Sequence, residues 1–180
     1  MTTLINASTS SGLVVTSDNS GEFALQSNGV TKATLTNAGF AYPGAVIQVV
    51  QASYQGATST TSASFQNTGL SGTITPKSSS SKIYVSATLA AKVQSGTTNC
   101  ITLFRNGSNL LPQHLLQHSS AGDYVPVTLQ YLDSPNTASA CTYTVYFRSA
   151  AGNGAYTSAV GGDQYGAYPV QIITMMEIAQ

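Results

Sequence analysis

Two histidines, His114 and His118, have the spacing that comes closest to a metal-binding motif. In a helix, this i, i+4 spacing would place both imidazoles on one face, as in many zinc sites. No Glu follows His114, Pro112 precedes it, and Asp123 is the one acidic residue nearby. We therefore expect a loop or short helical turn with incidental histidines and no bound metal. The sequence leaves one alternative open, in which a histidine meets its own copies at the axis of a symmetric trimer.

Nucleophilic and acid–base chemistry has little support in the sequence. Serine is abundant, but no Gly-x-Ser-x-Gly turn presents one as a nucleophile. Asp123 and Asp133 flank one predicted strand and Asp163 lies in a long loop, so we expect solvated carboxylates rather than a catalytic pair. Cys100 and Cys141 lie in separate strand-like segments and are expected to be buried, unpaired thiols. The sequence thus predicts a protein that is not an enzyme and needs no cofactor.

The chain carries very few charges for its length of 180 residues. Six basic and six acidic side chains make up 7% of it and give a formal net charge of zero. Nucleic-acid binders need Lys and Arg to neutralise phosphates, so we expect no nucleic-acid partner and no electrostatic membrane contact. The N-terminus lacks the basic and apolar regions of a signal peptide, and the apolar runs are too short to span a membrane. With so few charges, copies of the chain repel one another weakly, which is typical of a protein that is part of an assembly.

Residues 1–44 differ from the rest and read as a small meander. We expect short strands at 13–16, 22–26 and 30–36, with a type I′ turn at Asn28-Gly29, where both residues tolerate positive φ. Tyr42-Pro43-Gly44 ends the region. Its few apolar residues cannot close a core alone, and the simplest partner is a second copy of the same segment. We predict a β-rich arm for attachment and trimerisation through Leu13, Val15, Phe23, Leu25, Val30 and Leu35.

From residue 45 onward the strand-like segments lengthen and alternate between apolar and polar residues. Small polar and β-branched residues with scattered Gly favour strands over helices, and 42% hydrophobic residues are too many for a disordered chain. The expected strands lie at 45–54, 70–75, 82–93, 99–105, 108–111, 124–132, 140–148 and 169–179, with a hairpin turn at Asn106-Gly107. Such spacing predicts an all-β chain in which residues 45–180 form an antiparallel β-sandwich of jelly-roll type.

A long loop rich in Gly and Tyr is expected at 150–168. Tyr supplies contact area at little entropic cost and Gly supplies adaptability, a combination found in binding loops. Tyr156, Tyr165 and Tyr168 are therefore candidate binding residues, although a solvated connection is the simpler interpretation. The remaining aromatic residues are expected in the core or in cross-strand pairs; these are Tyr124, Tyr131, Tyr143, Tyr146 and Phe147.

Several segments together resemble virion proteins of tailed bacteriophages. Residues 19–39 are similar to the short, repeat-like arms of phage fibres and other virion proteins. Four further segments resemble, in this order, a family of structural proteins abundant in phages of aquatic bacteria: PGAVIQVVQ at 43–51, SSSKIYV at 79–85, FRNG at 104–107 and ITMMEI at 173–178. The resemblance spans nearly the whole chain. It implies a virion component, usually a homotrimer with an outward-facing β-sandwich head, and it transfers no catalytic residue.

The resemblance is compatible with two locations of the protein on the phage particle. A capsid decoration (cement) protein would sit as trimers on the capsid, with its arm against the major capsid protein or another virion protein. A tail or head fibre would attach through the same arm and bind a host surface receptor with its distal loops. The short arm favours decoration, and the Tyr/Gly-rich loop favours receptor binding. We expect a decoration protein on the virion surface, assembled in the host cytoplasm.

Overall fold

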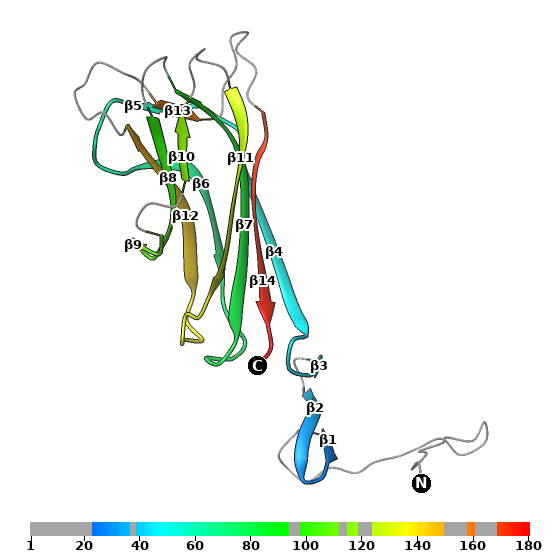
Figure 1. Cartoon of the computed structure of the whole chain (residues 1–180). Helices are drawn as coiled ribbons and strands as arrows, with labels where there is room; N and C mark the ends of the chain where they lie inside the picture. The colour runs from blue at the N-terminus through cyan, green and yellow to red at the C-terminus, as the bar shows by residue number, and fades with distance from the viewer. Residues whose placement is uncertain are drawn as a thin grey trace. The chain divides into compact units, whose positions relative to one another are not determined.

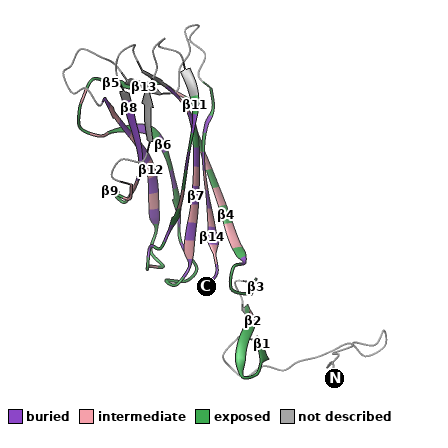
Figure 2. Cartoon of the chain, in the orientation of Figure 1, coloured by how far each residue is buried: buried purple, intermediate pink, exposed green. Residues whose placement is uncertain are grey.

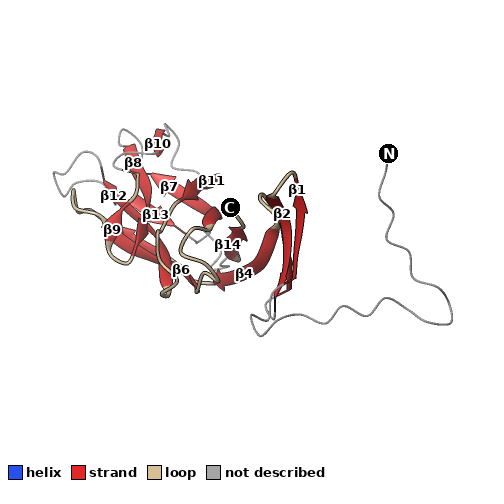
Figure 3. Ribbon diagram, turned by 90° about the horizontal axis from the view of Figure 1, so that it is seen from below, coloured by secondary structure: helices blue, strands red, loops and turns tan. Residues whose placement is uncertain are grey.

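The computed structural model of the chain describes residues 23–36, 39–93, 98–111, 115–118, 124–149, 158–160 and 169–180. The chain separates into two compact units, Met1–Pro43 and Gly44–Gln180. Within the described residues the ribbon consists of strands and loops (Figure 3). The same residues include no helix that is long and apolar enough to cross a membrane.

The N-terminal unit contains a single antiparallel sheet. Its strands are β1 (Phe23–Ser27), β2 (Val30–Thr36) and β3 (Gly39–Ala41), in the order β1-β2-β3 (Figure 1). Asn28 and Gly29 have φ angles of 52° and 73°, which confirms the expected turn with two positive φ values. The sequence pattern missed β3, and the strand expected at 13–16 lies outside the described residues.

The second unit contains two antiparallel sheets. Its strands are β4 (Val46–Tyr54), β5 (Thr58–Thr60), β6 (Gln66–Ile74), β7 (Lys82–Val93), β8 (Thr98–Arg105), β9 (Ser108–Asn109), β10 (Leu115–His118), β11 (Tyr124–Asp133), β12 (Cys141–Ser149), β13 (Ser158–Val160) and β14 (Gln171–Ile178). One sheet has the order β10-β8-β12-β6, with β9 also paired to β8. The other has the order β4-β14-β7-β13-β5, with β11 paired to β7.

The strand order is that of a jelly roll. β14 and β13 both pair with β7, while β4 pairs with β14 and β5 pairs with β13. β13 therefore occupies the same position in the sheet order as β14, and β5 the same position as β4. The main strands therefore read β4-β14-β7-β11 in one sheet and β6-β12-β8-β10 in the other, the arrangement of an eight-stranded jelly roll. This confirms the predicted fold class.

The core lies between the two sheets, where alternate residues of each long strand are buried (Figure 2). β12 alternates along its whole length, as its sequence predicts, because one face packs against the other sheet and the other face is partly exposed. The largest fully buried apolar side chains are Tyr143, Phe147, Leu70, Ile74, Ile83, Ile101, Leu103, Leu129, Ile173 and Met175.

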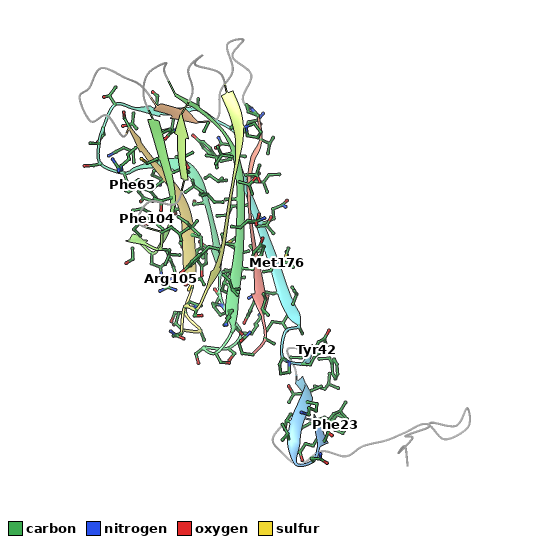
Figure 4. The ribbon with its side chains drawn as sticks, viewed as in Figure 1. Phe23, Tyr42, Phe65, Phe104, Arg105 and Met176 are labelled. Carbon is green, nitrogen blue, oxygen red and sulfur yellow. The ribbon has the colours of Figure 1, made fainter. Side chains whose placement is uncertain are left out.

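Tyr146 belongs to the opposite face of β12 and forms a cross-strand pair. Its ring stacks on Phe104 with a centroid separation of 4.1 Å, and Phe65 meets Phe104 edge-on at 5.9 Å (Figure 4). The guanidinium of Arg148 lies 5.3 Å from the centre of the Phe65 ring. These contacts hold the segment before β6 against the outside of its sheet.

The register divides the connections between the two ends of the sandwich. The end of β7 pairs with the start of β11, and the start of β8 pairs with the ends of β10 and β12. The connections 94–97, 119–123 and 150–157 therefore begin and end at one end of the sandwich. The segment 161–170 leaves the same region after β13. The chain enters at the opposite end, where the Gly44 N–H donates to the Ala179 carbonyl at 2.8 Å.

Candidate assembly surface

One face of the N-terminal sheet carries a row of apolar side chains. Phe23 pairs with Leu35, and Leu35 pairs with Phe40, so the three side chains lie side by side across β1, β2 and β3. They are 37%, 48% and 53% exposed. Leu25, in the next row, is also exposed, and its partner Ala33 is buried. We call Phe23, Leu25, Leu35 and Phe40 the arm face; Phe23 is labelled in Figure 4.

The arm face includes only part of the set predicted from the sequence. Leu13 and Val15 lie outside the described residues. Val30 pairs with Ser27 beside the turn and is exposed on the same face, beyond the Leu25–Ala33 pair. The sequence reasoning missed Phe40, whose ring lies 6.2 Å from that of Tyr42. The alternation of small and aromatic residues at 39–42 was the available signal.

A single sheet of this size leaves its apolar face in water. Sheets are stable when an apolar face packs on a second layer, and short isolated strands are marginal. Within the described residues, the N-terminal unit supplies no second layer of its own (Figure 2). The arm face is therefore the surface of this unit that would gain most from a partner.

Asp133 shows where the sequence interpretation was wrong. It was expected to be a solvated loop residue, but β11 extends to it and turns its carboxylate into the interior. Its Oδ2 accepts hydrogen bonds from Arg105 Nη1 and from the Tyr143 hydroxyl, each at 2.6 Å. The alternation that places Val127, Leu129 and Tyr131 on the inward face of β11 could have predicted this inward position.

The Asp133 cluster connects the two sheets at the end where the chain enters. Asp133 belongs to the sheet of β11, whereas Arg105 and Tyr143 lie on β8 and β12 of the other sheet. Burial and the bond to Asp133 raise the pKa of the Tyr143 hydroxyl well above its ordinary value of 10.0. Burial opposes the charge of Arg105, but its hydrogen bond and ion pair with Asp133 outweigh this effect and raise its pKa. The carboxylate thus has two donors already and acts as a link between sheets.

Cys100 and Cys141 are buried free thiols, as expected. Burial raises the pKa of both thiols above the ordinary value of 9.0. Each thiol is therefore more fully protonated at a given pH than an exposed one, which makes it a poor nucleophile.

We expect the stability of the fold to decrease as the pH rises above about 9. Cys100, Cys141 and Tyr143 all have raised pKa values in the folded state. Between the ordinary and raised values the folded state binds more protons than the unfolded state, so the free energy of unfolding falls with increasing pH. Urea unfolding at about pH 7 and about pH 10 measures this change. A Cys100→Ala/Cys141→Ala variant isolates the tyrosine contribution, and a midpoint that stays constant or rises would contradict the prediction.

The described part of the histidine segment is a strand, and the expected loop or helical turn was wrong there. Residues 115–118 form β10, which pairs with β8, because the chain returns along the edge of that sheet after the Asn106-Gly107 turn. The backbone of His118 lies opposite Thr98, while His114 lies outside the described residues. Among the residues that the structure describes, no three His, Cys, Asp or Glu side chains are grouped closely enough to hold a metal ion.

The interior becomes more polar towards the end of the sandwich that bears the connections 94–97, 119–123 and 150–157. Asn99 and Gln171 are fully buried there, and the Asn99 amide and Gln171 Oε1 have no hydrogen-bond partner among the described residues. Buried polar groups of this kind weaken the core locally. The residues Tyr156, Tyr165, Tyr168, Asp123 and Asp163, which the sequence analysis singled out, lie outside the described residues.

No protein-family model matches the chain, and no curated protein matches it either.

Proposed function

We propose that the chain is a non-enzymatic structural protein of a tailed-bacteriophage virion, a homotrimeric capsid-surface decoration protein anchored by its N-terminal unit. The observation that carries this proposal is the arm face, an apolar sheet surface that no second layer covers among the described residues of its unit, next in the chain to a sandwich with a core of its own. The segments that resemble phage virion proteins support the same assignment.

Physical considerations favour a closed assembly of identical copies. Three arm faces that meet around an axis would bury Phe23, Leu35 and Phe40 and protect the short strand edges. Cyclic symmetry stops growth at a defined number of copies. A chain with no net charge brings identical surfaces together with little repulsion. Jelly rolls occur in viral capsid proteins but also in lectins and cupins, so the fold alone does not carry the proposal.

A second candidate function is that of a tail or head fibre. Four connections leave the sandwich at the end opposite the point where the chain enters. A protein anchored through its N-terminal unit could use such an end to contact a host surface receptor. The two candidates share the arm and differ in what the far end of the sandwich does.

The native mass of the full chain tests the proposal. Light scattering after size exclusion should give the mass of a trimer, and a monomer would contradict the proposed assembly. Quantifying the protein in purified phage particles then separates the candidates. A decoration protein covers the capsid in many copies, whereas a fibre is present in few.

We expect the double substitution Tyr156→Ala/Tyr165→Ala to leave both the fold and host adsorption unchanged if the protein is a decoration protein. Tyr156 and Tyr165 belong to a segment rich in Gly and Tyr, a composition that is typical of binding loops. Adsorption of phage particles carrying the variant measures the effect, with Gln130→Ala, at an exposed position of β11, as a control for loss of a surface side chain elsewhere. A marked fall in adsorption, with a normal amount of protein per particle, would instead support the fibre.

A further inference from the structure

A second apolar row crosses the outside of the β4-β14-β7-β11 sheet. Val49 pairs with Met176, Met176 pairs with Tyr84, and Tyr84 pairs with Leu132, so four strands contribute one residue each. Directly paired residues share a face of the sheet, and the residues on either side of Tyr84 are buried in the core. We call Val49, Tyr84, Leu132 and Met176 the head row; Met176 is labelled on β14 in Figure 4.

The head row is exposed at both ends. Val49 is 57% and Leu132 48% exposed, while Tyr84 and Met176 are half-buried between them. The adjacent row towards the connections is polar and consists of Gln51, Thr174, Ser86 and Gln130. Single exposed apolar residues are ordinary, but apolar residues that join across a whole sheet mark an interaction surface.

Charge limits what can cover the head row. Glu177 and Asp133 belong to these strands, but both are buried and accept hydrogen bonds. Lys82 is the charged residue closest to the row, at the register position beside Ile178. Covering this surface with a charged partner would desolvate ions without pairing them, so an uncharged partner is favoured. The chain itself has such surfaces and no net charge.

The arm face and the head row are linked by a run of exposed apolar residues along the chain. Phe40 and Tyr42 precede Gly44, and Val46 and Val49 follow it, and all four are exposed. Val46 pairs with Ile178 at the end of the sandwich where the chain enters. The exposed apolar residues of the N-terminal unit are therefore followed directly, along the chain, by exposed apolar residues of the first strand of the sandwich.

We propose that the head row contacts neighbouring copies of the same chain, so that the trimer interface extends from the arm onto the base of the sandwiches. The proposal rests on the proposed trimer. When the sheet faces a three-fold axis, the same residues of each copy meet there, and the contact closes after three copies. Burial of this surface supplies part of the hydrophobic stabilisation of the trimer.

Cysteine cross-linking of the full chain tests the head row directly. Val49→Cys and Leu132→Cys place a reactive thiol at each end of it, and Ser71→Cys places one at an exposed position of β6 on the other sheet as the matched control. Cys100 and Cys141 are buried and are present in all three variants. A short bismaleimide should shift Val49→Cys or Leu132→Cys, but not Ser71→Cys, to a band of twice the chain mass on a denaturing gel.

The outcomes separate this proposal from the proposed function. A trimer in which neither head-row variant cross-links more than Ser71→Cys would overturn the head-row contact and leave the trimer standing. A monomeric full chain would overturn both. In a second test, Val49→Lys/Leu132→Lys should convert much of the trimer into smaller species in light scattering. Its circular dichroism should keep the β-sheet signal, and an unchanged trimer population would count against the contact.

Discussion

Deletion of residues 1–43 is expected to give a folded monomer with about a quarter of the mass of the full-length trimer. The sandwich from Gly44 to Gln180 has a core of its own between two sheets, whereas no second layer covers the arm face in the part of its unit that the structure describes. The deletion removes the arm contact and leaves the sandwich hydrogen bonds, including that of Gly44 to Ala179. Light scattering measures the loss of the trimer, and thermal unfolding shows that the sandwich is still folded. In phage particles, the shortened protein should no longer be incorporated.

A full-length variant distinguishes loss of the arm face from loss of the whole segment. Phe23→Ser/Leu35→Ser/Phe40→Ser keeps the chain length and removes the apolar row. It should reduce trimer formation nearly as much as the deletion, because each buried large side chain contributes about 1.5–3 kcal/mol. Ala24→Ser is the control, since Ala24 lies on the opposite face of β1 and should have little effect. Normal incorporation of the deletion variant into particles would show that the arm does not attach the protein.

Asp133→Ala is expected to destabilise the sandwich by about 3 kcal/mol, the lower end of the range for breaking a buried ion pair. The substitution leaves the Tyr143 hydroxyl without its acceptor and Arg105 without its counter-ion between two packed sheets. The side chain of Arg105 is 26% exposed, so water can solvate part of its charge and lower the cost. The midpoint and slope of urea unfolding measure the change.

Two further substitutions separate the parts of the Asp133 cluster. Tyr143→Phe removes one hydrogen bond while it keeps the ring in the core, and should cost about 1 kcal/mol. Leu132→Ala changes the exposed neighbour of Asp133 and should change the stability of the monomeric sandwich by less than about 0.5 kcal/mol. If Asp133→Ala lowered the free energy of unfolding as little as Leu132→Ala, the bonds of the carboxylate would not stabilise the contact between the sheets. The deletion variant lacking residues 1–43 suits these measurements if it is monomeric.

Local patterns in the sequence predicted the long strands of the fold, but they missed the short strands β3, β5, β10 and β13. Alternation at 82–93 and 140–148 defined strands whose buried faces are those expected, because the two-residue period of a strand is a local property. Asn28-Gly29 and Asn106-Gly107 form turns with positive φ, because these residue types tolerate that conformation wherever they occur. The period also identifies which residues face inward, and strict use of it would have placed Asp133 in the core.

The candidate surfaces were predicted only in part. The sequence drew attention to Phe23, Leu25 and Leu35, because apolar residues in short strands need a partner. It missed Phe40 because β3 is only three residues long, so the alternation at 39–42 is too short to identify a strand on its own. The head row could not be read from the sequence at all, since its four members come from strands that are distant along the chain.

The sequence by itself determined the strand class, the turns and the shortage of charge, because these depend on residue type and near neighbours. Tertiary structure decided which distant strands pair, and therefore which side chains meet. Glu177 illustrates the difference: its carboxylate is fully buried and accepts bonds from the Lys77 N–H at 2.7 Å and from Gln48 Nε2 at 2.6 Å. Both partners are far from it in sequence, and only the pairing of β14 with β4 and the return of the chain after β6 bring them within reach. A buried charge is tolerable only where such donors converge, and this convergence is a property of the assembled sheets.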